Sequence, residues 1–173
     1  WMAHLGLSQG ETHLAAERFA RSHSQQPPGQ AGVTASPFHA WIDDWDLQSP
    51  GSDNFERFTL RAYSGDGEER FGYELSLTAD GPLVWHGDNG FNAKTVQGQG
   101  SRYYSQPYLR IEGSVTLHGE QKAVTGRGWL DREWSSQLLT AEQTGWDWFS
   151  LHLNDGRKLM AYRLRGGGED GGD

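Results

Sequence analysis

The chain has 173 residues and no cysteine. Without cysteine it has no disulfide framework, no thiolate nucleophile and no thiolate metal ligand, and its redox compartment stays undetermined. Clusters of Lys and Arg are also missing, and the formal net charge of -8 argues against nucleic acid as a main partner. No apolar run is long enough to cross a bilayer, so no transmembrane segment is expected.

The start of the chain lacks an initiator methionine, a basic leader region and an apolar leader region, since it reads Trp1-Met2-Ala3-His4-Leu5. We therefore expect a fragment of a longer protein, whose signal peptide would lie upstream. The length and the 35% of hydrophobic residues suit one globular domain with a core of its own.

The sequence is rich in glycine, with 24 glycines in all, and several segments alternate between apolar and polar residues. In residues 71–79 apolar side chains alternate with small or polar ones, and residues 109–117 repeat the pattern. Between such runs lie turn signals that suit antiparallel hairpins. They are Gly65-Asp66-Gly67, Asp80-Gly81, His118-Gly119 and Asp155-Gly156.

Three further strands are expected, over residues 122–131, 146–153 and 158–164, and the last two should pair across Asn154-Asp155-Gly156. These patterns together predict an all-β fold, built as an antiparallel meander.

The secondary structure of two other segments is less direct to predict. Residues 13–21 have the composition of a helix, yet they also alternate, and the β-rich context favours a strand that follows a turn at residues 8–11. Residues 24–30 are polar and rich in Pro and Gly, which predicts a loop. We expect the domain to span residues 1–165 and residues 166–173 to form a flexible Gly-rich, acidic tail or linker.

Residues 128–136 and 145–149 combine four tryptophans with several carboxylates. Trp is bulky, and Asp and Glu are rarely buried without a partner, so the mixture indicates an amphipathic pocket rim. A tryptophan-rich core with a structural salt bridge among Asp131, Arg132 and Glu133 explains the same residues.

Strand alternation predicts which residues of this cluster share a face. It places Trp129 and Asp131 on one face of their strand, and Trp146 and Trp148 on one face of the next. A second group of acidic and aromatic residues occurs at 41–46, where Trp41, Asp43 and Trp45 would share a strand face; three aspartates in four residues are usually a solvated strand end. Tyrosines at 103, 104 and 108 add phenol groups or simply pack.

Several chemistries lack their motifs. There is no His-Glu-x-x-His pair and no Gly-x-Ser-x-Gly elbow, and pairs such as His39 with Asp43 or His86 with Asp88 are common by chance. The Gly98-Gln99-Gly100-Ser101 stretch follows no buried strand and opens no helix, so we expect a loop at a barrel mouth rather than a phosphate cradle. No metal and no cofactor are expected.

Acid catalysis is the chemistry that the residue types favour most. A carboxylic acid walled by aromatic rings loses hydration and keeps its proton, while the ring faces stabilise a developing carbocation. Asp131 beside Trp129 has this composition. A strand-end aspartate that pairs with Arg132 or caps a turn is the structural alternative.

Three segments resemble the AttH and carotenoid 1,2-hydratase family, namely residues 103–107, 125–136 and 145–151. Residues 37–45 also resemble the family pattern, and the likeness covers roughly residues 1–165. Family members, often labelled predicted secreted hydrolases, consist of two lipocalin-like β-barrels in tandem. The resemblance therefore implies a lipocalin-like barrel that lacks part of its first strand and most of the second barrel.

The family's activities follow from the same resemblance. Carotenoid hydratases of the family add water to a terminal isoprenoid double bond without a cofactor, by acid protonation and water capture, and related proteins cyclise hydrophobic polyketides. The resemblance also implies a bacterial protein with a periplasmic or secreted location. The second lipocalin-like domain of the full-length chain would be its partner, beside a hydrophobic small-molecule ligand.

Our leading hypothesis is a barrel that binds a bulky terpenoid or lipid-like molecule and carries out hydration, hydrolysis or cyclisation. Asp131 and Glu133 would be catalytic, with Asp131 as the proton donor, and Arg132 and Asp147 would support them. A carrier of hydrophobic ligands in the cell envelope, without catalysis, is the alternative. A core filled by tryptophans with no cavity is a third. The residues expected to contact the substrate are Trp129, Trp134, Trp146, Trp148, Tyr104, Trp41 and Trp45.

Overall fold

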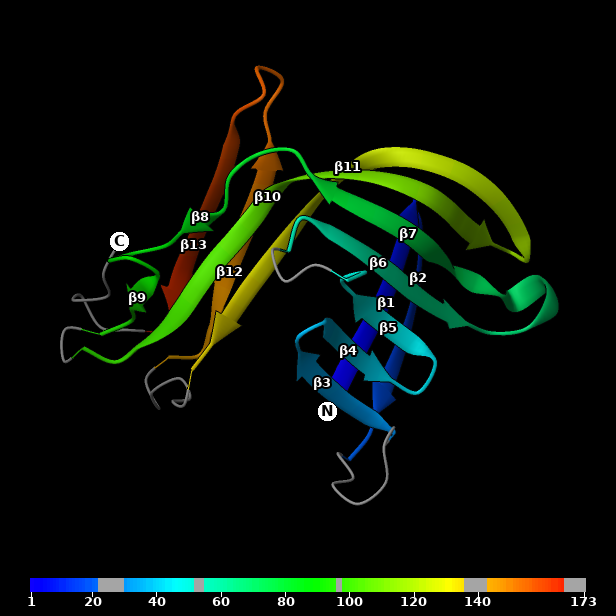
Figure 1. Ribbon diagram of the computed structural model, residues 1–173, viewed down its shortest axis with the longest axis horizontal. Coiled ribbons are helices and arrows are strands. Elements are labelled where there is room, and N and C mark those ends of the chain that lie inside the picture. Colours follow the sequence, from blue (N-terminus) through cyan, green and yellow to red (C-terminus); the bar gives the residue numbers. More distant parts are fainter. Residues whose placement is uncertain (22–29, 52–54, 96–97, 136–142, 167–173) are drawn as a thin grey trace. The chain divides into compact units, whose positions relative to one another are not determined.

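The computed structural model describes residues 1–21, 30–51, 55–95, 98–135 and 143–166 (Figure 1). These residues form thirteen strands and one short 3-10 turn, η1 (Gly67–Glu69), so the predicted all-β class is confirmed. No helix in this part of the chain has the length and apolar character needed to cross a membrane. In chain order the strands are β1 (Met2–Gln9), β2 (Thr12–Phe19), β3 (Ala31–Ala35), β4 (Phe38–Ile42), β5 (Trp45–Gln48), β6 (Arg57–Ser64), β7 (Phe71–Ala79), β8 (Val84–Trp85), β9 (Phe91–Ala93), β10 (Gly100–Leu117), β11 (Glu120–Trp134), β12 (Gly145–His152) and β13 (Lys158–Arg165).

The main sheet has the strand order β11-β10-β7-β6-β5-β4-β3, and the short strands β8 and β9 also pair with β10. Strands β3 to β7 follow one another as an antiparallel meander, as predicted. The pairs β1–β2 and β12–β13 are two further antiparallel hairpins. The predicted pairing of the last two strands is therefore confirmed.

Two local predictions can be compared with these strands. The strand interpretation of residues 13–21 is confirmed by β2, which pairs with β1 across a turn at Gly10 and Glu11. The loop predicted at 98–101 is wrong at its end, because Gly100 and Ser101 begin β10 and pair with β9. The loop predicted at 24–30 and the tail at 166–173 lie outside the described residues, apart from Gln30 and Gly166.

The hairpin expected at Asp80-Gly81 is also wrong, because β7 pairs with β10 rather than with the strand that follows it. Gly81 is needed there for close packing. A Cβ on Gly81 would lie 2.5 Å from the Tyr108 ring. The Gly81 carbonyl oxygen accepts a 3.1 Å hydrogen bond from the Gln106 side chain. A glycine that looks like a turn residue in the sequence is in fact a contact residue.

The chain divides into two compact units. Unit 1 consists of Trp1–Asp80 and Leu109–Gly128, and unit 2 consists of Gly81–Tyr108 and Trp129–Asp173. The long strands β10 and β11 contribute to both, which explains why the alternating pattern runs on without a linker between the units.

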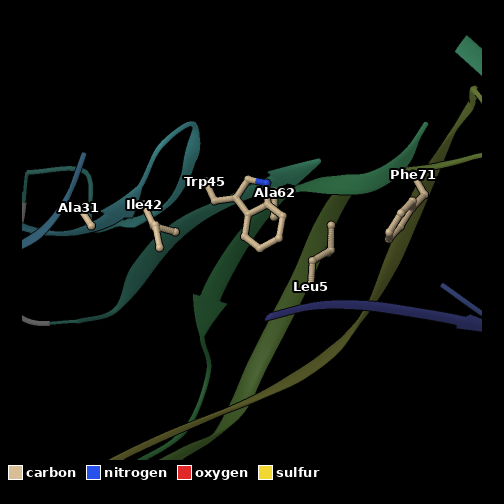
Figure 2. Packing of buried hydrophobic residues seen from close by; sticks show 6 residues of the cluster. All are labelled: Leu5, Ala31, Ile42, Trp45, Ala62 and Phe71. Atoms are coloured by element: carbon tan, nitrogen blue, oxygen red, sulfur yellow. The ribbon is translucent and has the colours of Figure 1, made fainter. Parts of the chain in front are cut away.

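Unit 1 has an apolar core in which β1 packs on the meander (Figure 2). Leu5 of β1 is 1% exposed, and burial of a leucine side chain of this size contributes roughly 1.5–3 kcal/mol. Period-two alternation directs these side chains inward. The core residues drawn in Figure 2 are Leu5, Ala31, Ile42, Trp45, Ala62 and Phe71.

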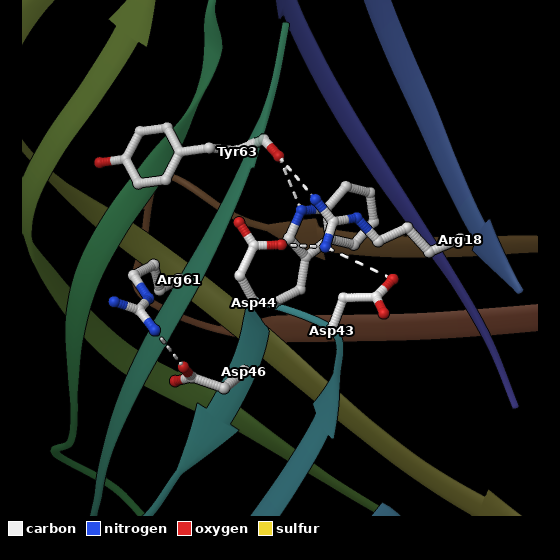
Figure 3. Close-up of polar contacts among 7 residues, drawn as sticks. Arg18, Asp43, Asp44, Asp46, Arg61 and Tyr63 are labelled. Atoms are coloured by element: carbon white, nitrogen blue, oxygen red, sulfur yellow. Dashed lines mark hydrogen bonds and ion pairs between the residues drawn. The ribbon is translucent and has the colours of Figure 1, made fainter. Parts of the chain in front are cut away.

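The acidic group at residues 41–46 forms a hairpin in unit 1 (Figure 3). Asp43 and Asp44 are the turn between β4 and β5, and the Arg18 guanidinium pairs with both carboxylates. The turn reverses the chain, so Ile42 opposes Trp45 while Trp41 opposes Asp46. The prediction that Trp41, Asp43 and Trp45 share a strand face is therefore wrong, because they do not belong to one strand.

Candidate functional site

The candidate site lies in unit 2, where the first half of β10 and the end of β11 bring polar side chains together. On β10 the residues Ser101, Tyr103 and Ser105 recur with a period of two and therefore share a face. On β11 the residues Asp131 and Glu133 do the same. The pairing of the two strands turns two ordinary alternations into one polar cluster.

The Asp131 carboxylate is the centre of this cluster. Its Oδ1 accepts hydrogen bonds from the hydroxyl of Tyr103 and from Nε1 of Trp129, both at 3.0 Å. The Ser105 hydroxyl donates to the same oxygen. Trp129 and Asp131 thus share a strand face, as predicted, and the indole holds the carboxylate directly.

Tyr103 joins this carboxylate to the next hairpin. Its hydroxyl accepts a 3.2 Å hydrogen bond from Nε1 of Trp148 on β12 and donates a hydrogen bond to Asp131. Burial of the ring, reinforced by the negative charge of Asp131 and opposed by the Trp148 N–H, raises the pKa of Tyr103 to about 12. The phenol therefore keeps its proton at neutral pH and acts as a donor.

His86 extends the cluster on the side of Ser105. The Nε2 atom of His86 lies 2.7 Å from the Ser105 hydroxyl oxygen, and its ring packs on Tyr103 with centroids 4.1 Å apart. Burial lowers the pKa of His86, although the charges of Asp131 and Glu133 act against this. The imidazole is therefore neutral at pH 7.

Glu133 has a different environment from Asp131. Its Oε1 accepts a 2.5 Å hydrogen bond from Ser101 and lies 2.9 Å from Nζ of Lys94. The Lys94 ammonium also lies over the ring of Tyr162, 4.5 Å from its centroid. One carboxylate is thus held by neutral donors and the other by a cation.

These groups border a cavity of about 790 Å³ in unit 2. Cross-strand pairing in β12–β13 places Trp146 opposite Leu164 and Trp148 opposite Tyr162, and all four line the cavity. Trp134 and Trp146 are 54% and 57% exposed, so large apolar surfaces face open space here. The full lining is Lys94, Thr95, Gln99, Gly100, Ser101, Tyr103, Asp131, Glu133, Trp134, Ser135, Gln143, Trp146, Trp148, Tyr162 and Leu164.

The cavity decides against a wholly packed interior in unit 2. A volume of this size is within the range that holds small-molecule ligands, and apolar walls with a few convergent polar groups are typical of such sites. Among the described residues no group of three or more His, Asp or Glu side chains is arranged to hold a metal ion.

Most of the predicted site residues lie together. Asp131, Glu133, Trp134, Trp146 and Trp148 line the cavity. The other residues expected beside them are not part of the lining. Trp129 bonds Asp131, the Tyr104 ring contacts Trp85 and Trp134, the Arg132 guanidinium lies 6.0 Å from the Tyr104 ring centroid, and Asp147 pairs with Arg165 at 3.7 Å on the surface.

Trp41 and Trp45 belong to unit 1 and are not part of this cluster. Trp45 is a core residue whose Nε1 donates a 2.7 Å hydrogen bond to the carbonyl oxygen of Tyr63. Trp41 packs against the ring of His39 with centroids 4.9 Å apart. Both border a smaller hollow of about 220 Å³ in unit 1.

Five residues that the structure places in the site were not predicted from the sequence. Counting back equally from the His118-Gly119 turn sets residues 102–106 opposite 131–135 and so brings the two segments together, but it pairs Ser105 with Arg132 and therefore does not predict its contact with Asp131. Lys94 and His86 come from short connections around β8 and β9, which have no such pattern. The missed residues are His86, Lys94, Ser101, Ser105 and Tyr162.

Comparisons with known proteins agree with the fold. The model of the AttH-like family matches residues 1–172. The crystal structure of an AttH-type protein from Nitrosomonas europaea has 34% sequence identity and a TM-score of 0.79, with 98% of this chain and 50% of that chain covered. Kievitone hydratase from Nectria haematococca shares 23% identity with a TM-score of 0.50, over 76% of this chain and 43% of that one, which shows a similarity of fold. Functionally curated proteins give no match.

Proposed function

Because this chain belongs to the AttH-like family, we propose that unit 2 binds a bulky apolar molecule of the terpenoid or lipid class and adds water to it by acid catalysis. Asp131 is the proton donor in this proposal, and no cofactor takes part. Hydrolysis or cyclisation would use the same acid and the same cavity.

One observation carries the proposal: a carboxyl group borders a cavity whose walls include the indole rings of Trp134, Trp146 and Trp148. Trp146 and Trp148 present their rings from β12, and Asp131 faces the same space from β11. Such rings attract a developing positive charge through their π-faces. The cavity thus combines an acid with a surface that favours a carbocation.

The reaction can be written with this chain's own groups. Asp131 takes up a proton from solvent and gives it to one carbon of the double bond, and the π electrons form the new C–H bond. The cation left on the other carbon is captured by water, which forms a C–O bond. The Glu133 carboxylate, held next to Lys94 at 2.9 Å, takes the excess proton from the added water. Both carboxyl groups then exchange protons with solvent, so alkene and water give an alcohol.

The neighbours of Asp131 fit this role. The raised pKa of Tyr103 and the lowered pKa of His86 leave both rings uncharged at neutral pH. Uncharged groups around the acid do not form an ion pair with the developing cation.

A second candidate function, a carrier without catalysis, also has support. Three donors converge on Oδ1 of Asp131, which is how a structural carboxylate in a strand is usually held. In a carrier the cavity would hold its ligand unchanged.

Substitution of Asp131 by Asn separates the two functions. Asparagine keeps the shape and the acceptor oxygen, so the three donors stay satisfied while the transferable proton is lost. With prenyl phenyl ether as the probe, we expect quenching of tryptophan fluorescence to persist. Formation of the tertiary alcohol, followed by uptake of isotopically labelled water, should fall by roughly a hundredfold to ten-thousandfold.

Asp155→Asn is the matched control, because Asp155 lies in the β12–β13 turn and pairs with Arg157 on the surface. It should leave binding and turnover unchanged. Equal turnover in wild type and Asp131→Asn would remove Asp131 as the acid. Binding of the probe without alcohol formation in the wild-type protein would favour the carrier.

A partner is also proposed for the outer face of the β12–β13 hairpin. The chain spans about half the length of the Nitrosomonas europaea protein. Phe149, Leu151 and Leu159 share the face opposite the cavity and are 45–57% exposed. A second lipocalin-like domain of a longer chain would cover them, and hydrogen exchange on that longer chain should show protection of β12 that residues 1–173 alone lack.

The compartment is a proposal by family resemblance alone. A periplasmic or secreted location predicts that an antibody against unit 2 detects the protein in the periplasmic or extracellular fraction of its host. Detection in the cytosolic fraction would contradict it.

A further inference from the structure

His86 is held in a chain of hydrogen bonds that ends on Asp131. The Ser105 hydroxyl has one proton, and this proton is directed to Oδ1 of Asp131. The hydroxyl oxygen must therefore accept from His86, so Nε2 of His86 carries a proton and donates it over 2.7 Å. The hydrogen bonds thus run from His86 to Ser105 and from Ser105 to Asp131, and each donor points toward the carboxylate.

The direction of these hydrogen bonds cannot reverse. Ser105 is fully buried, at 0% exposure, so no solvent molecule offers its hydroxyl another partner from outside. The His86 ring is fixed by its stack on Tyr103, and the His86 backbone N–H donates to the Tyr103 carbonyl at 3.1 Å. The same tyrosine donates its hydroxyl to Asp131, so ring and carboxylate share one support.

The two oxygens of Asp131 are consequently different. Among the described residues, every hydrogen bond given to this carboxylate ends on Oδ1. An oxygen that already accepts three hydrogen bonds has no room for a proton of its own. The transferable proton of the acid therefore belongs on Oδ2.

From this arrangement we propose that His86 is a positioning residue, which acts through Ser105 to reserve Oδ1 of Asp131 as an acceptor and Oδ2 as the atom that carries the proton for the substrate. The inference rests on the proposed acid catalysis. It adds a residue outside the cavity lining to that reaction and assigns the reacting atom of the carboxyl.

The test compares two substitutions of His86. His86→Gln keeps an N–H donor near the position of Nε2, whereas His86→Phe keeps a ring to pack on Tyr103 but has no donor. Without the donor the Ser105 oxygen accepts no hydrogen bond, so the hydrogen bond that Ser105 donates to Asp131 is weaker and the carboxyl group is held less firmly. Prenyl phenyl ether as substrate should give a kcat for His86→Phe that is roughly tenfold to a hundredfold lower, with KM nearly unchanged. His86→Gln should recover most of the kcat.

The chain offers a matched control. His13 Nδ1 and Ser8 Oγ form a 2.8 Å hydrogen bond on the exposed surface of unit 1, and no carboxylate follows in that pair. His13→Phe is the same chemical change and should leave kcat and KM as they are.

A second readout does not depend on turnover. A buried hydroxyl proton shared with a carboxylate exchanges slowly and gives its own proton NMR signal, which Ser105→Ala identifies. This signal should be present in wild type and His86→Gln and lost in His86→Phe. If the probe is turned over by the wild-type protein and His86→Phe keeps its kcat, the role of His86 is wrong while acid catalysis stands. If the wild-type protein turns over no probe, acid catalysis fails, and a Ser105 signal that persists in His86→Phe would overturn the positioning role as well.

Discussion

Nε1 of Trp148 lies 3.2 Å from the hydroxyl oxygen of Tyr103, and this contact joins the wall of the cavity to its acid. The tyrosine hydroxyl donates a 3.0 Å hydrogen bond to Asp131, so an indole on β12 is linked through a phenol on β10 to a carboxylate on β11. The three strands therefore cannot shift independently without the loss of a buried hydrogen bond.

This link predicts how Tyr103 titrates. Its pKa lies at about 12 instead of the ordinary 10.0, because of burial and of the negative charge of Asp131. Asp131→Asn removes that charge and should lower the value, whereas Trp148→Phe removes the donor that favours the phenolate and should raise it. Absorbance of tyrosinate, taken as the difference between each protein and its Tyr103→Phe counterpart, measures both shifts.

The sign for stability follows from the same value. Between pH 10 and pH 12 the unfolded chain releases the Tyr103 proton and the folded protein retains it, so the free energy of unfolding falls as the pH rises through this range. Tyr103→Phe should lose this part of the alkaline decline. An identical pH dependence in wild type and Tyr103→Phe would contradict the raised pKa.

The sequence alone allowed the class of the fold and half of the site to be predicted. Alternation on β11 places Trp129 and Asp131 on one face, and the 3.0 Å hydrogen bond between them confirms it. The same rule brings Trp146 and Trp148 to the cavity. These predictions succeed because a strand fixes side-chain direction every second residue, whatever it packs against.

The rest of the site depends on contacts between distant segments. His86 and Lys94 flank the two-residue and three-residue strands β8 and β9, which are too short to show a period. Ser101 and Ser105 reach the carboxylates only through the register of β10 against β11. At 41–46 the two-residue turn at Asp43 and Asp44 was not recognised, so one strand was expected where two are paired.

The ion pair of Lys94 and Glu133 should contribute a measurable coupling energy. Their side chains are 22% and 40% exposed, and the 2.9 Å contact lies beside the Tyr162 ring, which limits screening by water. A double-mutant cycle with Lys94→Met and Glu133→Gln should give a coupling of about 1 kcal/mol in urea unfolding. The coupling should shrink in high salt; no coupling at low salt would show that the pair is not formed in solution.

The core of unit 1 should be sensitive to Leu5. This side chain is 1% exposed within the apolar cluster of Figure 2, so Leu5→Ala removes apolar contacts and leaves a void. We expect a loss of about 2–5 kcal/mol in the free energy of unfolding. Leu159, at 47% exposure, gives the matched change, and Leu159→Ala should cost under about 0.5 kcal/mol in the same urea titration. Equal losses would mean that β1 does not pack as described.

The turn that follows His86 gives a test of how the positioning residue is itself placed. Gly87 has a φ of +64°, and a Cβ there would lie 2.1 Å from the carbonyl oxygen of Phe91. Gly10 has nearly the same conformation, with a φ of +58°, but a Cβ there would meet nothing within 4 Å. Alanine at either site must adopt the left-handed region, which costs about 1 kcal/mol, whereas only Gly87→Ala must also displace the backbone of the turn. In urea unfolding Gly87→Ala should therefore lose clearly more stability than Gly10→Ala, and the Ser105 hydroxyl signal should weaken only in Gly87→Ala. Equal losses, with the signal intact in both, would show that this turn does not hold His86 in place.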